Sequence, residues 1–372
     1  MALNRNELVK NEILHSSDFS LNEYLDMTQF TGNPAKAVAF NLRGISQLGV
    51  KGMVPENRDS YGLSFFTRPQ LCLNEKNLRN DRMFYNLLTN ESRSIMRYIR
   101  CMLDPRQARD PGAMITSPFV DEELGFIPVL TNNITSMSGW PDITLDSYTS
   151  PQGMRREAWS IADAPIDIVD AFDINCTFRN TKDEPIIMMM YYWIRYMSLV
   201  FEGMMSPYLD FITENEIDYN TRIYRLVLDE NKRFVKKISA TGASFPTSVP
   251  YGKFFDFQDM VKYNTQTKDI DITFKCNGAN YNDPILIDEF NAVQGIFNRN
   301  MRISKETKRA AQTSPGKVPV PSFSGLEKIP FDLLESFNFR GYPYINPETL
   351  ELEWYISTSS QYYQTAKRAF AL

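Results

Sequence analysis

The chain of 372 residues has a single histidine, His15, in an N-terminal stretch without a regular periodic pattern. Ser-His-Asp and Cys-His nucleophile systems use an imidazole as general base, and most zinc sites use histidine as a ligand. The sequence also lacks a GxxxxGKS or GxxxxGKT phosphate loop, a GxGxxG turn after a predicted strand and a GxSxG elbow. We therefore predict that His15 lies on the surface and that these usual catalytic and nucleotide sites are absent.

Acidic residues form several local clusters. A pair of carboxylates can serve a glycosidase, and oxygen ligands can hold a metal ion. Asp173 and Asp271, however, alternate with apolar residues in strand-like segments, so a solvated sheet face explains them without catalysis. We predict no enzymatic activity, no cofactor and no metal, and we keep a carboxylate-based hydrolase as the less favoured alternative. The clusters are Asp121 with Glu122 and Glu123, Asp142 with Asp146, Asp163 with Asp167, Asp170 and Asp173, and Asp269 with Asp271.

The four cysteines, Cys72, Cys101, Cys176 and Cys276, are scattered, and no two of them form a CxxC pair. Disulfides are rare in reducing compartments, and Cys176 and Cys276 fall on the apolar sides of predicted strands. The sequence therefore predicts four buried, reduced thiols without metal, in a protein made in a cytoplasm.

Positive charge is not concentrated in any block of the chain, which has 40 basic and 45 acidic residues and a net charge of −5. Tight nucleic-acid binding requires many phosphate contacts from a basic patch, so the composition argues against it. Arg93, Arg97 and Arg100 share one side of a predicted helix. A phosphate site is one interpretation of this spacing, and a solvated helix face is the favoured one.

Two segments alternate strictly between apolar and polar residues, as β-strands with one buried face do. They are residues 172–178 and 270–276, and their polar faces must meet water. The expected apolar set is Phe172, Ile174, Cys176 and Phe178 with Ile270, Ile272 and Phe274. The expected polar set is Asp173, Asn175 and Thr177 with Asp271, Thr273 and Lys275.

Residues 186–205 are almost entirely apolar and follow Pro185, which suits the first position of a helix. The length would allow a membrane span. Arg195 lies near the middle, however, where a charge costs about 2.5–3.5 kcal/mol in a bilayer. Trp193 is also central, whereas membrane helices favour Trp at the membrane–water interfaces. We predict a buried helix that packs on the two strands, with Ile194 in the core, and no membrane contact.

Further segments complete a predicted α+β fold with antiparallel sheets around that one apolar helix. A hairpin is expected from residues 221–228 and 233–240, joined by the polar link 229–232. Strands are expected at residues 61–69, 126–130, 134–137 and 350–356, and helices at 82–103 with a break near 89–90, at 284–301 and at 359–372.

The distribution of Gly and Pro residues and of predicted elements divides the chain into three parts. Residues 1–57 form an N-terminal arm, which contains many Gly and Pro residues but also apolar residues such as Val38 and Phe40 that argue against simple disorder. Residues 58–283 form the main domain, with a helical insertion at about 80–112, and residues 284–372 form a C-terminal extension. The first residues lack the layout of a signal peptide.

The order of these parts resembles the tail-tube fold of contractile-tailed phages and related injection systems such as type VI secretion. In that family a strand leads to one helix, and a later hairpin ends in a loop with glycine and Phe-Pro before a short strand that carries aspartate. Here those features are Gly242, Phe245 with Pro246, and residues 254–257, which include Asp256. The resemblance covers residues 58–283, and the length and extra parts are most similar to baseplate tube-initiator proteins.

The resemblance implies a structural virion protein, made in the host cytoplasm, that forms a hexameric ring at the baseplate. Such a ring links the central hub to the tail tube, and the polar set given above would face the lumen. The expected partners are further copies of the chain, other tube, hub, baseplate or sheath proteins, and DNA that passes without specific binding during genome ejection. The acidic balance suits a channel that repels phosphate. The alternatives are the main tail tube protein or another tail, neck or sheath protein.

Overall fold

The computed structural model describes residues 59–109, 121–163, 170–302 and 323–364, apart from residues 92, 122, 257–258, 264–266, 324, 335–336, 338–339, 359 and 361–362. The N-terminal arm with His15 lies outside the described residues. So does nearly all of the helix that the sequence predicts at residues 359–372.

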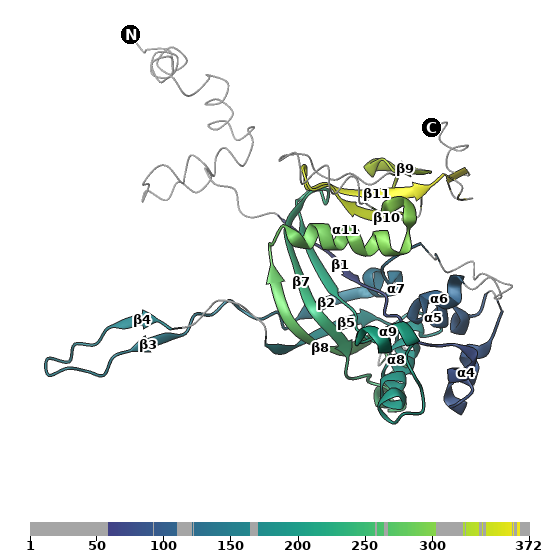
Figure 1. Ribbon diagram of the computed structural model, residues 1–372, viewed down its shortest axis with the longest axis horizontal. Coiled ribbons are helices and arrows are strands. Elements are labelled where there is room, and N and C mark those ends of the chain that lie inside the picture. Colours follow the sequence, from purple (N-terminus) through teal and green to yellow (C-terminus); the bar gives the residue numbers. More distant parts are fainter. Residues whose placement is uncertain are drawn as a thin grey trace, which may run out of the picture. The chain divides into compact units, whose positions relative to one another are not determined.

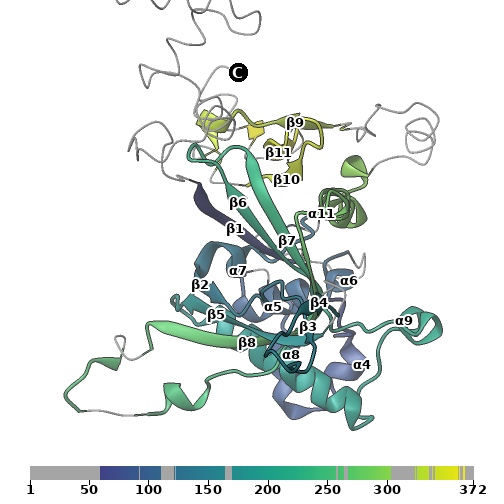
Figure 2. The same ribbon diagram turned by 90° about the vertical axis from the view of Figure 1, so that its left-hand side faces the viewer.

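A six-stranded sheet forms the centre of the fold. Its order is β1-β6-β7-β8-β5-β2, every neighbouring pair is antiparallel, and the sheet curls into a half-barrel (Figure 2). The predicted α+β class with an antiparallel sheet is therefore confirmed. The strands are β1 Ser60–Phe66, β2 Ile134–Ser138, β5 Ala171–Arg179, β6 Ile223–Leu228, β7 Val235–Pro246 and β8 Asp269–Tyr281.

The pairing of β5 with β8 positions the alternating residues. The register runs without interruption from Ala171 opposite Asn277 to Arg179 opposite Asp269. Because successive side chains point to opposite faces, the apolar set expected from the sequence shares one face of the two strands. Phe172 is half-buried at the margin of the core, and the other members are buried. The buried members are Ile174, Cys176, Phe178, Ile270, Ile272 and Phe274.

The predicted apolar helix is α8, Pro185–Phe201, and it begins at the proline. Trp193 is fully buried among the strand residues, and Arg195 forms an ion pair of 2.9 Å with Asp81 at the margin. The prediction for Ile194 needs correction, because this residue is only partly buried and lies outside the core cluster. Helical geometry turns it away from the sheet when Trp193 faces inward. No helix among the described residues has both the length and the apolar character of a membrane span.

The glycine and Phe-Pro residues of the resemblance do not form a loop. Gly242, Phe245 and Pro246 all lie within β7, which pairs with β8 as far as Pro246 opposite Phe274. A Cβ atom at residue 242 would lie 2.3 Å from the carbonyl oxygen of Asn277, so the close approach of the two strands requires glycine here. The expected strand at residues 254–257 is also wrong, because its first residue ends a 3-10 helix, η2 Gly252–Phe254.

The insertion between β1 and β2 is mainly helical, and the predicted break near residue 89 is confirmed. Arg97 and Arg100 are buried, which corrects the prediction of a solvated arginine face, while Arg93 is exposed. The Arg100 guanidinium donates to the carbonyl oxygen of Leu73 at 3.0 Å. The elements are α4 Glu75–Leu78, η1 Arg82–Leu88, α5 Ile95–Leu103, α6 Pro105–Arg109 and α7 Pro128–Asn133. A strand was predicted at α7, but Pro128 starts a helix there.

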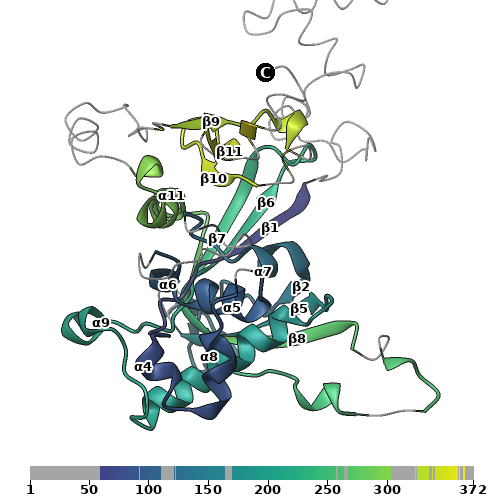
Figure 3. The same cartoon turned by 90° about the vertical axis from the view of Figure 1, so that its right-hand side faces the viewer.

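The C-terminal part adds a helix and a three-stranded sheet of order β10-β11-β9. Asn291 of the helix donates its amide to Ile345 O at 2.8 Å and accepts the Ile345 N–H at 2.9 Å, so helix and sheet lie together (Figure 3). A second apolar cluster, with Phe65, Phe126 and Phe290, joins them to β1 and β6. The elements are α11 Ile285–Phe297, η3 Arg299–Met301, β9 Leu326–Lys328, η4 Phe331–Leu333, β10 Tyr342–Ile345 and β11 Leu352–Ser357.

A hairpin stands outside these sheets. Its strands, β3 Ser147–Thr149 and β4 Ser160–Ala162, pair only with each other (Figure 1), and every side chain of both is exposed. The sequence analysis predicts no strand in this stretch. The stretch is rich in Ser, Thr and Pro. Because its strands are short and bury no apolar face, their sequence shows no long alternation of apolar and polar residues that would predict them.

Candidate assembly surfaces

Six polar side chains form a cross-strand ladder on the exposed face of β5 and β8. They are the residues that the sequence analysis grouped, and the sheet brings all six together. Asp173 lies opposite Lys275, Asn175 opposite Thr273, and Thr177 opposite Asp271. The Lys275 ammonium is 3.1 Å from Asp173 Oδ1. The Thr177 hydroxyl donates to Asp271 Oδ1 at 2.9 Å. The Thr273 hydroxyl donates to Asn175 Oδ1, also at 2.9 Å.

The ladder carries two carboxylates and one ammonium, so its own charge is negative. Lys253 adds a second cation at the margin, 3.7 Å from Asp271 Oδ2. All these charged groups are at least one-third exposed, and ion pairs of this kind contribute only about 0–1 kcal/mol. The ladder is therefore a hydrated surface without the cluster of cations that would hold a phosphate chain.

Large apolar side chains are exposed in the β3–β4 hairpin and around it. Trp159 is 76% exposed, Met154 is fully exposed, and Ile143 and Ile161 are more than half exposed. Single exposed apolar residues are ordinary, but several on one uncovered hairpin indicate a surface that binds another protein.

Two loops next to the helices carry further apolar residues. Phe201, the last residue of α8, is 93% exposed, and Leu209 opens the short helix α9, Leu209–Glu214, as another exposed residue. Between β7 and β8, Phe255 and Met260 are both more than three-quarters exposed. Together with the hairpin, these loops give the chain several separate candidate contact surfaces.

A family model described as "Putative phage tail tube protein" matches residues 5–371, which is nearly the whole chain. The chain belongs to this phage tail tube family. It is a structural protein of the phage tail, and it resides in the virion.

Other comparisons add little to this assignment. The comparison with curated proteins finds no match. Among solved structures, a chain of the cryo-EM structure of the anti-feeding prophage cap, the tube-terminating cap, is similar at 16% identity. That match covers 42% of this chain and 81% of the other, with a TM-score of 0.26, which is too low to support any argument.

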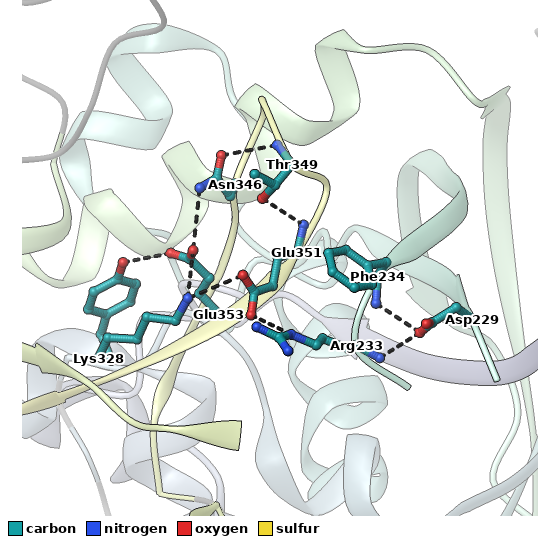
Figure 4. A network of polar contacts seen from close by, with 9 residues as sticks. Asp229, Arg233, Phe234, Lys328, Asn346, Thr349, Glu351 and Glu353 are labelled. Carbon is teal, nitrogen blue, oxygen red and sulfur yellow. Dashed lines mark hydrogen bonds and ion pairs between the residues drawn. The ribbon is translucent and has the colours of Figure 1, made fainter. Parts of the chain in front are cut away.

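The tail tube protein ties its C-terminal sheet to the β6–β7 hairpin through a network of charged residues (Figure 4). Arg233 Nε donates to Glu351 Oε1 at 2.8 Å. Lys328 Nζ lies 2.9 Å from Glu353 Oε1 and 3.3 Å from Glu351 Oε2. Asp229 Oδ1 accepts the backbone N–H groups of Arg233 and Phe234 and so shapes the turn. The sequence analysis missed this network because its members are far apart in the chain.

The pKa values of this network follow from its geometry. Partial burial alone would raise the pKa of Glu351, but hydrogen bonds from Arg233 and Lys328 lower it below its ordinary value. Partial burial would likewise lower the pKa of Lys328, but the hydrogen bonds to Glu353 and Glu351 raise it. Glu351 and Lys328 therefore both stay charged near neutral pH, so their ion pair holds the two sheets together there.

The candidate catalytic carboxylates do not gather in one site. Asp121 Oδ1 and Glu123 Oε2 lie together at the Tyr342 hydroxyl, at 3.2 Å and 2.9 Å. Asp142 and Asp146 are exposed beside the β3–β4 hairpin, and Asp173 and Asp271 belong to the ladder. No group of three or more His, Cys, Asp or Glu side chains in the described part of the chain could hold a metal. All four cysteines are buried and free, and burial raises the pKa of Cys72 and of Cys276 to about 11. The thiols are therefore protonated and shielded.

Proposed function

We propose that this protein forms a ring of the phage tail tube at the baseplate, where it joins the central hub to the tube and lines the DNA channel. The ladder on β5 and β8 carries the proposal. It is a continuous hydrated face on two paired strands, while the opposite face of those strands is buried against α8. A channel wall needs this combination, because one face must meet water and the other must be rigid.

The edges of the sheet support a ring. β1 and β2 are the two outer strands of the half-barrel, and an outer strand has backbone groups that a neighbouring chain can pair with. Copies that join edge to edge would satisfy these groups and close the curled sheet into a barrel. The number of six copies comes from the resemblance to contractile-tail tubes.

The charge of the ladder fits the passage of DNA. Lys275 and Lys253 balance Asp173 and Asp271, so repetition around a ring would give a wall without a concentration of positive charge. Such a wall does not bind phosphate, so DNA would pass without being held.

A reconstruction of the assembled particle tests the proposal directly. We expect sixfold density at the baseplate end of the tube, with β5 and β8 facing a central channel. Density that places these strands against the sheath, or within a solid core, would contradict the lumen assignment. Density in the repeating part of the tube would favour the alternative role of main tube protein.

The assembly behaviour of the purified protein separates the two roles. A tube initiator needs a template ring, so we expect the protein alone to remain small at micromolar concentration and to assemble on hub particles. Light scattering measures the size of the free protein, and negative-stain microscopy shows whether it assembles on hub particles. Spontaneous growth of long tubes from the protein alone would identify it as the main tube protein instead.

A further inference from the structure

A cavity of about 530 Å³ lies beside β1, and its walls come from β1, α7 and the C-terminal sheet. Pockets of about 300–1,000 Å³ commonly hold ligands of drug size, which are larger than an indole ring. Phe331 lines the cavity and is 42% exposed, so the cavity opens to solvent. It can therefore take in a large aromatic side chain. Most of its lining is apolar and includes Leu63, Phe65, Phe126, Leu352 and Trp354.

Two exposed residues of opposite charge also line the cavity. Lys232 lies in the turn between β6 and β7, and Asp332 lies in η4. Neither side chain forms an ion pair or a hydrogen bond with a residue that the structure describes. A partner that matches this cavity therefore needs a large apolar side chain with a basic group and an acidic group beside it.

The β3–β4 hairpin presents such an apolar side chain. Tyr148 lies opposite Ile161, and the pairing continues to Trp159, whose carbonyl oxygen accepts the Ser150 N–H at 3.0 Å. Because side chains alternate along a strand, Tyr148, Trp159 and Ile161 share one face of the hairpin. All three are more than half exposed. The hairpin thus has an apolar face that its own chain leaves uncovered.

The turn of the hairpin adds both signs of charge. Arg155, Arg156 and Glu157 lie two to four residues before Trp159, and all three are exposed. The two arginines form no ion pair with a residue that the structure describes. Glu157 Oε2 accepts the backbone N–H of Arg155 at 2.8 Å, which holds the carboxylate at the turn. The arginines match Asp332 of the cavity, and Glu157 matches Lys232.

The order of the strands places this hairpin near the cavity of another copy. β1 and β2 are the two outer strands of the main sheet, so edge-to-edge joining brings β2 of one copy to β1 of the next. Residues 139–146 connect β2 to β3 and can span up to about 28 Å when extended. β1 forms one wall of the cavity through Gly62, Leu63 and Phe65. The hairpin of one copy can therefore reach the cavity of its neighbour.

We propose that the β3–β4 hairpin docks in the cavity of a neighbouring copy, with Trp159 between the apolar walls. Arg155 and Arg156 then lie near Asp332, and Glu157 lies near Lys232. The inference rests on the ring proposed above and adds a contact that joins its subunits. Hairpin and cavity are different surfaces of the chain, so the contact is head-to-tail, as closure of a ring requires.

A peptide-binding experiment tests the docking. The probe is a fluorescein-labelled peptide of residues 147–162, closed by a disulfide between cysteines added at its two ends. Fluorescence anisotropy measures its binding to the full chain. We expect saturable binding that becomes at least tenfold weaker when the peptide carries Trp159→Ala. Ser147→Ala, on the other face of the hairpin, is the matched control and should bind as the unchanged peptide does.

Exchange of charges tests the orientation. Asp332→Arg in the chain should weaken binding of the unchanged peptide severalfold, because it places like charges together. A peptide with Arg155→Glu and Arg156→Glu should recover binding to this variant. Equal binding of the unchanged and Trp159→Ala peptides, or a charge exchange without recovery, would overturn the proposal. Circular dichroism checks that the chain variant is folded.

Cross-linking tests the same contact between full chains. The four native cysteines are buried, so an added pair of cysteines reports the contact. A chain with Trp159→Cys is mixed with a chain with Asn132→Cys, an exposed residue that lines the cavity, and the mixture is oxidised at high protein concentration. We expect a covalent dimer on a non-reducing gel, and none when Tyr85→Cys replaces Asn132→Cys.

The outcomes separate the docking from the ring. Absence of both peptide binding and the covalent dimer would overturn the docking and leave the ring to the particle reconstruction. Peptide binding does not require a ring, so binding together with density that lacks sixfold symmetry would overturn the ring alone.

Discussion

At the scale of single residues, the fold depends on polar groups that are fully enclosed. Asp104 is completely buried at the end of α5. Its Oδ2 accepts the Leu73 N–H at 2.9 Å and the Tyr208 hydroxyl at 2.7 Å, and its Oδ1 accepts the Arg106 N–H at 3.1 Å. Loss of solvation nevertheless dominates and raises the pKa of Asp104 to about 6. The carboxyl group therefore joins the insertion to the loop after α8 and responds to mild acid.

We predict a pH-dependent effect of Asp104→Asn. The pKa of Asp104 is higher in the folded chain than its ordinary value of 3.8, so its contribution to stability is complete below about pH 4 and is lost as the pH rises through about 6. The melting temperature of the wild type minus that of Asp104→Asn should therefore fall from pH 4 to pH 6 and level off above pH 7. Parallel curves for the two proteins would contradict the raised pKa.

The core of α8 gives a second prediction at this scale. Trp193→Ala removes a fully buried ring and should lower the free energy of unfolding by about 3–5 kcal/mol. Phe201→Ala, at the exposed end of the same helix, is the matched control and should change it by less than about 0.5 kcal/mol. Urea denaturation measures both. Equal effects would mean that α8 does not bury the face described here.

At the scale of elements, the charged network fixes the C-terminal sheet to the β6–β7 hairpin. Backbone pairing continues the link, because the Val235 N–H donates to Leu350 O and the Leu352 N–H donates to Arg233 O. Glu351 is central, since it binds both Arg233 and Lys328. Removal of its charge would leave both cations without this partner.

We predict that Glu351→Gln increases hydrogen exchange in β9–β11 at pH 7, while exchange in β5 and β8 stays unchanged. The lowered pKa of Glu351 means that its contribution is present above its ordinary value of 4.5 and is lost as the pH falls through the folded value. The difference between the two proteins should therefore disappear in acid. Glu348→Gln, an exposed change in the same turn, is the control.

The elements also show what the sequence can predict. Strict alternation located β5 and β8, and Pro185 located the start of α8, because these signals are local and one face is buried. The ladder was predicted for the same reason. Ile194 and Arg97 were misplaced, since helical periodicity alone does not say which neighbours cover a face. The network around Glu351 joins Arg233 and Glu351, which are 118 positions apart, and no local pattern encodes it.

At the scale of the whole molecule, the main sheet has a buried apolar core, and other parts of the chain carry exposed apolar side chains. The β3–β4 hairpin contributes no residue to the four apolar clusters of the described chain. Its exposed Trp159 and Ile161 therefore add nothing to the core, and exposed apolar side chains grouped in this way are typical of surfaces that bind other proteins.

We predict that replacing residues 147–162 by a short Gly-Ser link leaves the melting temperature within about 2 °C of the wild type, because no core contact is lost. Assembly onto hub particles should fail, and sedimentation of mixed components measures this. The double variant Met83→Ser and Tyr85→Ser, at exposed apolar residues of η1, is the control for a general loss of surface hydrophobicity. Full assembly without the hairpin would show that the tail contacts lie elsewhere.

The position of β1 in the sheet has a consequence for synthesis on the ribosome. β1 ends at Phe66, but its partner strand β6 begins only at Ile223. Phe66 is therefore synthesised long before Ile223, the residue that lies opposite it in the sheet. At about 5–20 residues per second, translation of the intervening chain takes roughly 8–30 s. During that time Phe65 and Phe66, both buried in the finished protein, have no sheet to join. We therefore expect the nascent chain to be prone to aggregation during this interval, and removal of holding chaperones from a translation system should increase aggregation of ribosome-attached chains.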